Sequence, residues 1–250
     1  ANNMRIKRFG VCIAALCAVA AVSAATETGD KEPFWLGGDI SGMNATRLRV
    51  WVNPKDGFCS PEDVLKMAKR SQALGMPVMI DFHYSDWWAD PGKQNPPKAW
   101  LGMTLEQTEK ALADHTRQTL RLLKDNGIDV KWVQVGNETT HGFLWPMGRF
   151  EENPVNYASL TKAGIKAVRE VYPEAEVIIH LDNGFDQGLY DRVFDSLKSN
   201  GVEWDTIGIS VYPYWAPEWN AEDDYRLGAF SRNMPTVIMD AFKEAASSAR

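Results

Sequence analysis

The sequence contains little cysteine and little histidine. Three of its 250 residues are cysteines and four are histidines. Cys12 and Cys17 lie in an N-terminal segment that we expect to be removed, which leaves Cys59 as the single cysteine of the mature chain. An internal disulfide and a cysteine-rich metal site are therefore excluded.

Basic residues are also in the minority. Lys and Arg number 27 against 33 Asp and Glu, which gives a formal net charge of −6. Without Arg5, Lys7 and Arg8, which lie in the same N-terminal segment, the charge becomes −9. Such an acidic surface argues against nucleic acid or an anionic membrane as a partner, and it suits a neutral substrate.

The N-terminal segment has the three parts of a secretory signal peptide in the required order. Residues 4–8 include three basic side chains, residues 11–22 are mostly apolar, and residues 22–24 are small. The apolar run is too short to span a membrane stably, and a buried core helix is the less favoured alternative. We therefore expect residues 1–24 to be a signal peptide, and residues 25–250 to be a monomeric protein that is secreted, periplasmic or attached to the cell surface.

The middle of the chain alternates strand-like and helix-like segments. This alternation predicts one α/β domain with a parallel sheet and helical crossovers, which a (β/α)8 barrel of about this length would provide. Helix starts are expected at Ser60-Pro61 and at Thr104, where Gln107 completes a capping box. The expected strands are residues 35–40, 47–52, 78–83, 132–135, 177–179 and 206–211.

Two places interrupt this alternation. Only about five residues separate the first two expected strands, although parallel neighbours need a crossover of about a dozen or more. We therefore expect the first crossover helix to be missing between Ser41 and Gly42. The sequence stops after the sixth strand, so the barrel would also lack its last two strands. A short seventh strand at residues 235–239, followed by Asp240, is the less favoured reading.

Polar residues stand at the ends of the expected strands, and tryptophans stand in the loops beyond them. Because barrel active sites lie at the carboxyl ends of the strands, these residues would converge on one cleft. Exposed indole rings stack well on sugar rings, so the cleft is expected to bind carbohydrate. The strand-end residues are Asp39, Asp81, His83, Asn137, Glu138, Asp182, Asn183 and Tyr212. The loop tryptophans are Trp87, Trp88, Trp100, Trp145, Trp215 and Trp219.

Six short motifs carry a family resemblance. They are GDIS (38–41), TRLRVWVNP (46–54), DFHYSD (81–86), WADP (88–91), VGNE (135–138) and LWP (144–146). In this order they resemble glycoside hydrolase family 53, the arabinogalactan endo-β-1,4-galactanases.

The resemblance implies a retaining clan A barrel that cleaves β-1,4-galactan. It places an acid/base glutamate after strand four and a nucleophilic glutamate after strand seven. The first maps onto Glu138, while the nucleophile has no matching position in this chain, so we expect the chain as it stands to be inactive.

The resemblance also assigns roles to neighbouring residues. Asn137 is expected to bind the sugar 2-hydroxyl. Arg47 and Arg49 lie on the same side of their strand and could keep the nucleophile ionised, and the resemblance favours Arg47. The complete set expected to bind substrate is Asp39, Arg47, Arg49, Asp81, His83, Asp86, Trp88, Asn137, Trp145, Asp182 and Tyr212.

Other interpretations of these residues stay open. Asp81 and His83 could bind a metal or make structural hydrogen bonds, but no histidine cluster supports a metal, so we expect no metal and no cofactor. His115 and His180 are expected to be packing residues, whereas His141 could line the cleft. Trp51 and Trp132 are expected in the core, and Trp204 is undecided. Two alternative functions are a non-catalytic carbohydrate-binding barrel and a metal-dependent barrel hydrolase.

Overall fold

A computed structural model of the protein describes residues 9–11, 45–184 and 186–210. In these ranges six strands form one parallel sheet in the order β1-β8-β7-β4-β3-β2. This sheet confirms the α/β class. The strands are β1 (Phe9–Val11), β2 (Thr46–Val50), β3 (Val78–Phe82), β4 (Val130–Val135), β7 (Glu176–Leu181) and β8 (Thr206–Ile209).

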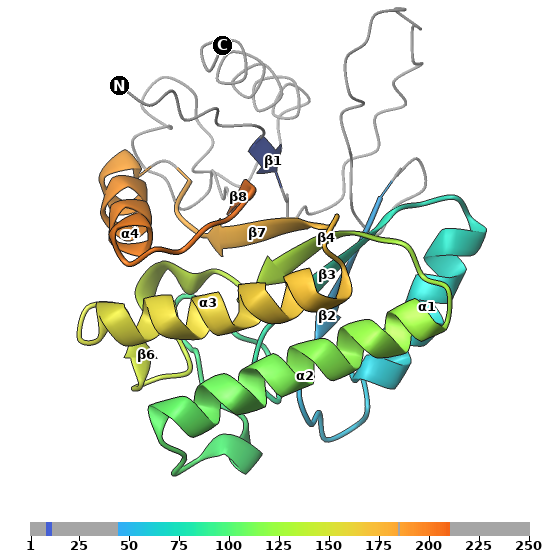
Figure 1. Cartoon of the computed structure of the whole chain (residues 1–250), viewed down its shortest axis with the longest axis horizontal. Coiled ribbons are helices and arrows are strands. Elements are labelled where there is room, and N and C mark those ends of the chain that lie inside the picture. The colour runs from blue at the N-terminus through green and yellow to red at the C-terminus, as the bar shows by residue number, and fades with distance from the viewer. Residues whose placement is uncertain (1–8, 12–44, 185, 211–250) are drawn as a thin grey trace, which may run out of the picture.

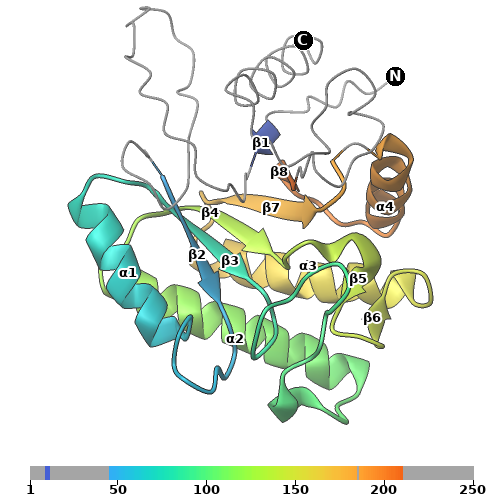
Figure 2. The ribbon, with the colours of Figure 1, turned by 180° about the vertical axis from the view of Figure 1, so that it is seen from behind.

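Four helices connect the consecutive strands from β2 to β8, and α1, α2 and α3 lie on one face of the sheet (Figures 1 and 2). The helices are α1 (Pro61–Ala73), α2 (Leu105–Asp125), α3 (Pro154–Val171) and α4 (Gln187–Ser199). Four short elements lie in the loops after β3 and β4 and were not predicted. They are η1 (Lys98–Trp100), η2 (Thr139–His141), β5 (Gly142–Phe143) and its antiparallel partner β6 (Gly148–Arg149).

Both helix starts were predicted correctly, because their signals are local. Ser60 caps α1 by accepting the Asp63 N–H at 3.3 Å, and Pro61 occupies the first turn. At α2, Thr104 and Gln107 form the expected capping box, with reciprocal contacts of 3.3 and 2.9 Å. Each cap satisfies backbone N–H groups that have no partner inside the helix.

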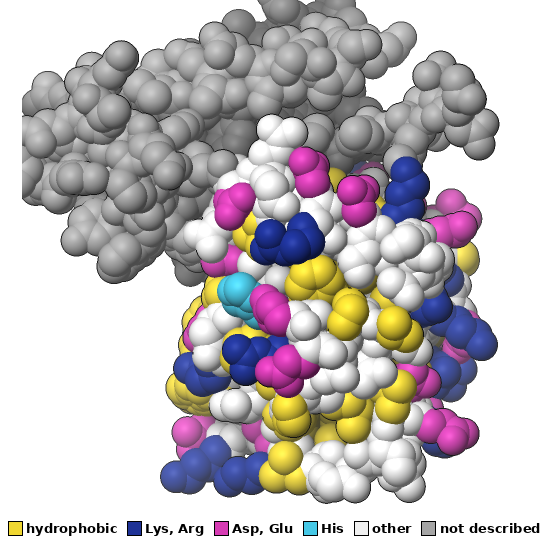
Figure 3. Space-filling view, turned by 90° about the vertical axis from the view of Figure 1, so that its left-hand side faces the viewer, with side chains coloured by type: hydrophobic (Ala, Val, Ile, Leu, Met, Phe, Trp, Pro, Cys, Tyr) yellow, Lys and Arg dark blue, Asp and Glu magenta, His cyan; other side chains and the backbone are white. Residues whose placement is uncertain are grey.

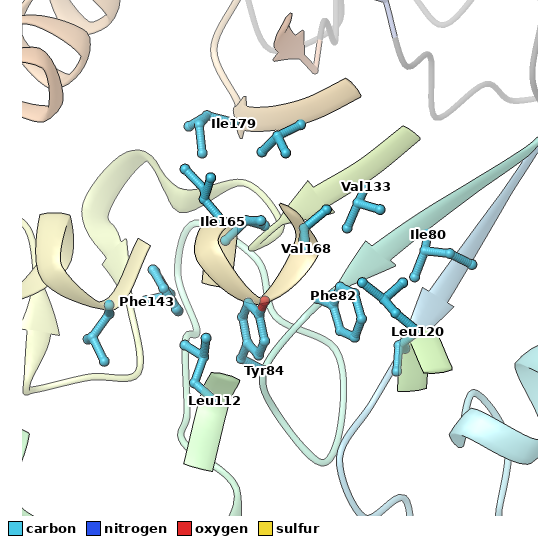
Figure 4. Close-up of a cluster of buried hydrophobic side chains, with 14 of the residues drawn as sticks. Ile80, Phe82, Tyr84, Leu112, Leu120, Val133, Phe143, Ile165, Val168 and Ile179 are labelled. Atoms are coloured by element: carbon cyan, nitrogen blue, oxygen red, sulfur yellow. The ribbon is translucent and has the colours of Figure 1, made fainter. Parts of the chain in front are cut away.

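The apolar core lies between the sheet and the helices. Successive residues of a strand point to opposite faces of the sheet, so every second residue contacts the helices. Figure 4 shows the core side of the sheet, where side chains from β3, β4 and β7 meet side chains from α2 and α3. The labelled residues of this cluster are Ile80, Phe82, Tyr84, Leu112, Leu120, Val133, Phe143, Ile165, Val168 and Ile179. The intervening residues, among them Asp81 and Gln134, belong to the opposite face.

Several predictions concern residues outside the described ranges. These are the strand at 35–40, the missing helix between Ser41 and Gly42, and the short strand before Asp240. Strand β1 was not predicted, because it lies in the expected signal peptide, yet it pairs with β8.

None of the helices in the described ranges combines the length and the apolar character that a membrane crossing requires. On the side of the molecule drawn in Figure 3, acidic and basic side chains are intermixed.

Candidate active site

The candidate site lies at the carboxyl end of the sheet, on the face opposite the helices. Arg47 of β2, Asp81 of β3, Gln134 of β4 and His180 of β7 occupy the strand positions between the core residues. Parallel pairing aligns these strands, and Arg49 is in register with Asp81, which is in register with Gln134. The alternation of each strand therefore brings polar residues that are far apart in sequence to one place.

Asp81 and Arg47 form the charged centre of this site. Asp81 is fully buried, and its Oδ2 lies 2.8 Å from Arg47 Nη2. The same Arg47 nitrogen donates to Asn137 Oδ1 at 2.7 Å and to Gln134 Oε1 at 3.2 Å. Gln134 Nε2 in turn donates to Asp81 Oδ1 at 2.5 Å. Arg47 thus connects a buried carboxylate to the residue that precedes Glu138.

His83 supplies the third contact to the buried carboxylate. Its Nδ1 accepts the N–H of Ala89 at 3.1 Å, so Nε2 carries the ring proton and donates to Asp81 Oδ2 at 3.2 Å. Burial by itself would raise the pKa of the Asp81 carboxyl, but Arg47 and His83 outweigh it and hold that pKa below its ordinary value. Asp81 is therefore ionised, and it fixes the position of Arg47.

Glu138 follows β4 in a strained backbone conformation. Its φ of 48° and ψ of 52° are left-handed, a region that few residues other than glycine adopt. The residue is 8% exposed. The preceding Asn137 has a fixed amide, because its Oδ1 accepts from Arg47 while its Nδ2 donates to the Ala89 carbonyl at 2.8 Å. The VGNE motif is thus held by neighbours from β2 and from the loop after β3.

His180 was expected to be a packing residue, and in the structure it also belongs to the polar network around Glu138. The ring is buried, but both of its nitrogens make polar contacts. Nδ1 lies 3.2 Å from the Glu138 backbone nitrogen and 3.1 Å from Asn137 Oδ1, and Nε2 lies 2.9 Å from Ser210 Oγ. Burial and the nearby Arg47 lower the pKa of His180 to about 3, so the ring is neutral and carries one proton. With that proton on Nε2, Nε2 donates to Ser210 Oγ and Nδ1 accepts the Glu138 N–H, and the Asn137 Oδ1 contact is then not a hydrogen bond.

The aromatic residues near the site divide into exposed and buried ones. Trp87 and Trp88 are 54% and 40% exposed and surround the buried Trp51, with Trp87 at a ring distance of 4.8 Å. The guanidinium of Arg49 covers one face of Trp88 at 3.9 Å. Trp100, which was expected in the cleft, instead belongs to the apolar core, because η1 turns it against His115.

The remaining aromatic and histidine predictions have mixed outcomes. Trp145 is half-buried, and its Nε1 donates to the His141 carbonyl at 2.8 Å. His141 is half-buried and contacts Glu151. Trp51 is buried as expected, whereas Trp132 was expected in the core and is only half-buried. The undecided Trp204 packs on Phe194 of α4 at 5.2 Å.

Two predicted carboxylates have structural contacts. Asp86 accepts the N–H groups of Asn53 and Lys98, both at 2.9 Å, and so joins the loops after β2 and β3. Asp182 accepts from the hydroxyl of Thr140 in η2, and burial raises the pKa of its carboxyl. A role of either residue in substrate binding stays a prediction.

Other predictions fall outside what the structure describes. Asp39 and Tyr212 lie beyond the described ranges, as do Trp215 and Trp219. Within those ranges no group of three or more His, Cys, Asp or Glu side chains is arranged to hold a metal ion.

The sequence analysis did not recognise three residues of the site, which are Gln94, Gln134 and His180. For two of them a signal existed, because Gln134 and His180 are polar residues inside apolar strands, at positions that alternate with the core.

Comparison with known proteins identifies the family. The model described as glycosyl hydrolase family 53 matches residues 10–238 of this chain. The chain belongs to this family. The matched range includes Glu138, Asp81 and Arg47, and the family is the one that the sequence motifs resemble.

Three relatives show the extent of the match to family 53. A probable arabinogalactan endo-β-1,4-galactanase A of Neosartorya fischeri is 37% identical over 184 residues, which are 71% of this chain and 51% of that protein. An endo-β-1,4-galactanase of Bacillus subtilis is 37% identical over 183 residues, which are 70% of this chain and 42% of that protein. The solved family 53 catalytic domain of Ignisphaera aggregans is 40% identical, with a TM-score of 0.66, and the match covers 70% of this chain and 50% of that one. The chain thus spans about half the length of the curated relatives it matches.

Proposed function

We propose that this family 53 protein hydrolyses β-1,4-galactosidic linkages inside galactan and type I arabinogalactan, with retention of configuration. The relatives from Neosartorya fischeri and Bacillus subtilis are named as endo-β-1,4-galactanases, and this supports the substrate. The observation that carries the proposal is the placement of Asn137 and Glu138 at the end of β4, where Arg47 and Asp81 fix the Asn137 amide.

The proposed chemistry uses two carboxyl groups about 5–5.5 Å apart. Glu138 protonates the leaving oxygen and then serves as the base for water. Asn137 uses one amide hydrogen on the Ala89 carbonyl, so the second one is available for the sugar 2-hydroxyl. The resemblance places the nucleophile after a seventh strand of a closed barrel, and no position in this sequence matches it. On that ground we propose that residues 25–250 alone are inactive.

Two tryptophans supply the proposed contacts with the sugar. Trp88 and Trp145 stack on galactose rings, and Arg47 and Asp81 keep the polar residues of the cleft in place.

The protein is monomeric and is exported through an N-terminal signal peptide. The acidic composition, with 33 acidic against 27 basic residues, supports a neutral polysaccharide rather than nucleic acid as the partner.

Substitution of Glu138 in the full-length protein tests the proposed role. In Glu138→Gln, kcat/KM on galactan should fall by about 10²–10⁴-fold, because the natural leaving group needs protonation. An aryl galactoside with an acidic phenol as leaving group should lose much less. Glu203→Gln, at an exposed loop position, is the matched control and should behave as wild type. Equal losses on the two substrates would contradict the assignment of Glu138 as the acid.

A further inference from the structure

We propose that Gln94 is a positioning residue that holds Glu138 in its left-handed conformation and so directs its carboxyl group. The inference rests on the proposed function of Glu138. Gln94 lies in the loop between β3 and η1, more than forty residues before Glu138 in the chain, and is 1% exposed. Its position at the VGNE turn is therefore produced by the fold.

The side-chain amide of Gln94 holds two consecutive carbonyl groups. Nε2 donates to the Asn137 carbonyl at 2.8 Å and lies 3.3 Å from the Glu138 carbonyl. A primary amide has two hydrogens on its nitrogen, so it can donate to both oxygens at once. A methionine of similar size at this position would offer no hydrogen, and a glutamate would offer none when ionised and only one when protonated.

These contacts determine the backbone angles of Glu138. The Asn137 carbonyl and the Glu138 N–H belong to the peptide plane before the Glu138 Cα, and the Glu138 carbonyl belongs to the plane after it. Gln94 holds both carbonyls, while His180 Nδ1 accepts the N–H at 3.2 Å. With both planes held, φ and ψ are fixed, and the direction of the Cα–Cβ bond follows. A non-glycine residue keeps left-handed angles only where its surroundings impose them.

Gln94 also connects this turn to the loop that carries Trp145. Its backbone carbonyl accepts the Trp145 N–H at 2.9 Å. Ala89 of the same loop accepts from Asn137 Nδ2. The loop after β3 therefore joins the acid/base residue to a tryptophan proposed to bind sugar, and Gln94 makes both connections.

Two variants of the full-length protein test the inference, Gln94→Met and Gln94→Glu. Misplacement of the acid should lower kcat on galactan by about 10–100-fold while KM changes little, because bound substrate no longer meets a correctly directed proton donor. The loss should be smaller on the aryl galactoside. Gln118→Glu, on the exposed side of α2, is the matched control and should retain wild-type kcat. If Gln94→Met does not fold, Gln94→Asn keeps the amide on a shorter stem and should show the same selective loss.

The outcomes separate this inference from the proposed function. Suppose that Glu138→Gln shows the selective loss on galactan. If the folded Gln94 variants then keep wild-type kcat, or lose equally on both substrates, the role of Gln94 is overturned and that of Glu138 stays intact. Equal losses in Glu138→Gln would instead contradict the proposed function. A rise in KM without a change in kcat in the Gln94 variants would also refute the positioning role, because it would show that Gln94 supports binding alone.

Discussion

The side chains of Arg47 and Arg49 project from the same face of β2 but have different contacts. Arg47 binds Asp81 and Asn137, whereas Arg49 lies over the Trp88 ring and next to the Cys59 thiol. One arginine therefore balances a buried charge, and the other covers an aromatic face. Because both side chains lie on the same face of the strand, the alternation could not distinguish these roles in the sequence; the difference comes from side chains supplied by other strands and loops.

Trp88 and Trp100 should respond differently to truncation. In Trp88→Ala, binding of galactan oligosaccharides should weaken by about 1 kcal/mol, because an exposed ring face is lost, while stability changes little. Trp100→Ala removes a buried ring and should lower the free energy of unfolding by about 3–5 kcal/mol. Titration calorimetry and urea unfolding on both variants measure the two effects. Unchanged binding with lowered stability in Trp88→Ala would show that Trp88 is a packing residue.

His115 should make stability depend on pH. Burial, partly offset by Asp86, lowers the pKa of His115 to about 4, and its Nε2 is buried without a hydrogen-bond partner among the described residues. Between pH of about 6.5 and about 4 the unfolded chain binds a proton that the folded chain does not. Stability should therefore fall as the pH falls through this window, by up to about 1.4 kcal/mol per pH unit from this residue.

Replacement of His115 by leucine isolates this contribution. Urea unfolding of wild type and His115→Leu at several pH values should show a flatter pH dependence in the variant between about pH 6.5 and 4. At neutral pH the variant should be as stable as wild type or more stable, because a buried nitrogen without a partner is removed. Parallel curves for the two proteins would contradict the neutral state of His115 in the folded protein.

Residues of the candidate site were predictable where they lie at the end of a strand or just after it. Glu138, Asn137 and Asp81 stand at the change from apolar to polar sequence, and the parallel sheet brings them together. Gln94 and Trp100 were not recognised in these roles, because both lie in the loop after β3, whose path depends on tertiary contacts such as those of Asp86 with Asn53 and Lys98. Local sequence carries no signal for such a path.

At the scale of elements, the helices and the main strands were predictable and the short pieces were not. The caps at Ser60 and Thr104 and the alternation in the strands are local signals of known period. By contrast, β5 and β6 have two residues each, too few for any period to be seen. They pair because the chain after Glu138 turns back on itself between β4 and α3.

The contact between α3 and the sheet depends on Gly164. A Cβ atom at this position would lie 2.7 Å from Val135 Cγ1, 3.0 Å from the Tyr84 hydroxyl and 3.3 Å from Leu112 Cδ2. Helix propensity alone would favour Gly164→Ala by about 1 kcal/mol, but the overlap should reverse the sign and cost about 1–3 kcal/mol. Gly188→Ala in α4, whose nearest contact would be 3.6 Å, is the control and should not destabilise. Chemical denaturation compares the two, and a stabilised Gly164→Ala would show that α3 packs less closely.

At the scale of the whole molecule, the parallel sheet agrees with the sequence, while its N-terminal edge raises a question. Strand β1 pairs Phe9–Val11 with β8, although these residues belong to the expected signal peptide. If the signal is cleaved, the mature protein cannot contain this strand. The sequence pattern could not reveal the pairing, because three residues are too few to show a strand period.

The N-terminus of the exported protein decides this question. We expect intact-mass measurement and N-terminal sequencing of the secreted protein to place the first residue at Ala25, after the small residues Val22-Ser23-Ala24. A matched variant, Ala24→Leu, should slow or shift the cleavage, because bulky residues fit poorly at the cleavage site. Secreted protein that keeps residues 9–11 would contradict the signal-peptide prediction and favour β1 as a permanent strand.

The alternation within β3 restricts how the length of this protein can change during evolution. Ile80 and Phe82 face the helices while Asp81 faces the candidate site. A single residue inserted before Ile80 would exchange these faces, so that a carboxylate would enter the apolar core and two large apolar groups would enter the polar network. Stability and chemistry would fail together. A substitution, in contrast, affects one face only, so strands can diverge in sequence while insertions and deletions are confined to the loops.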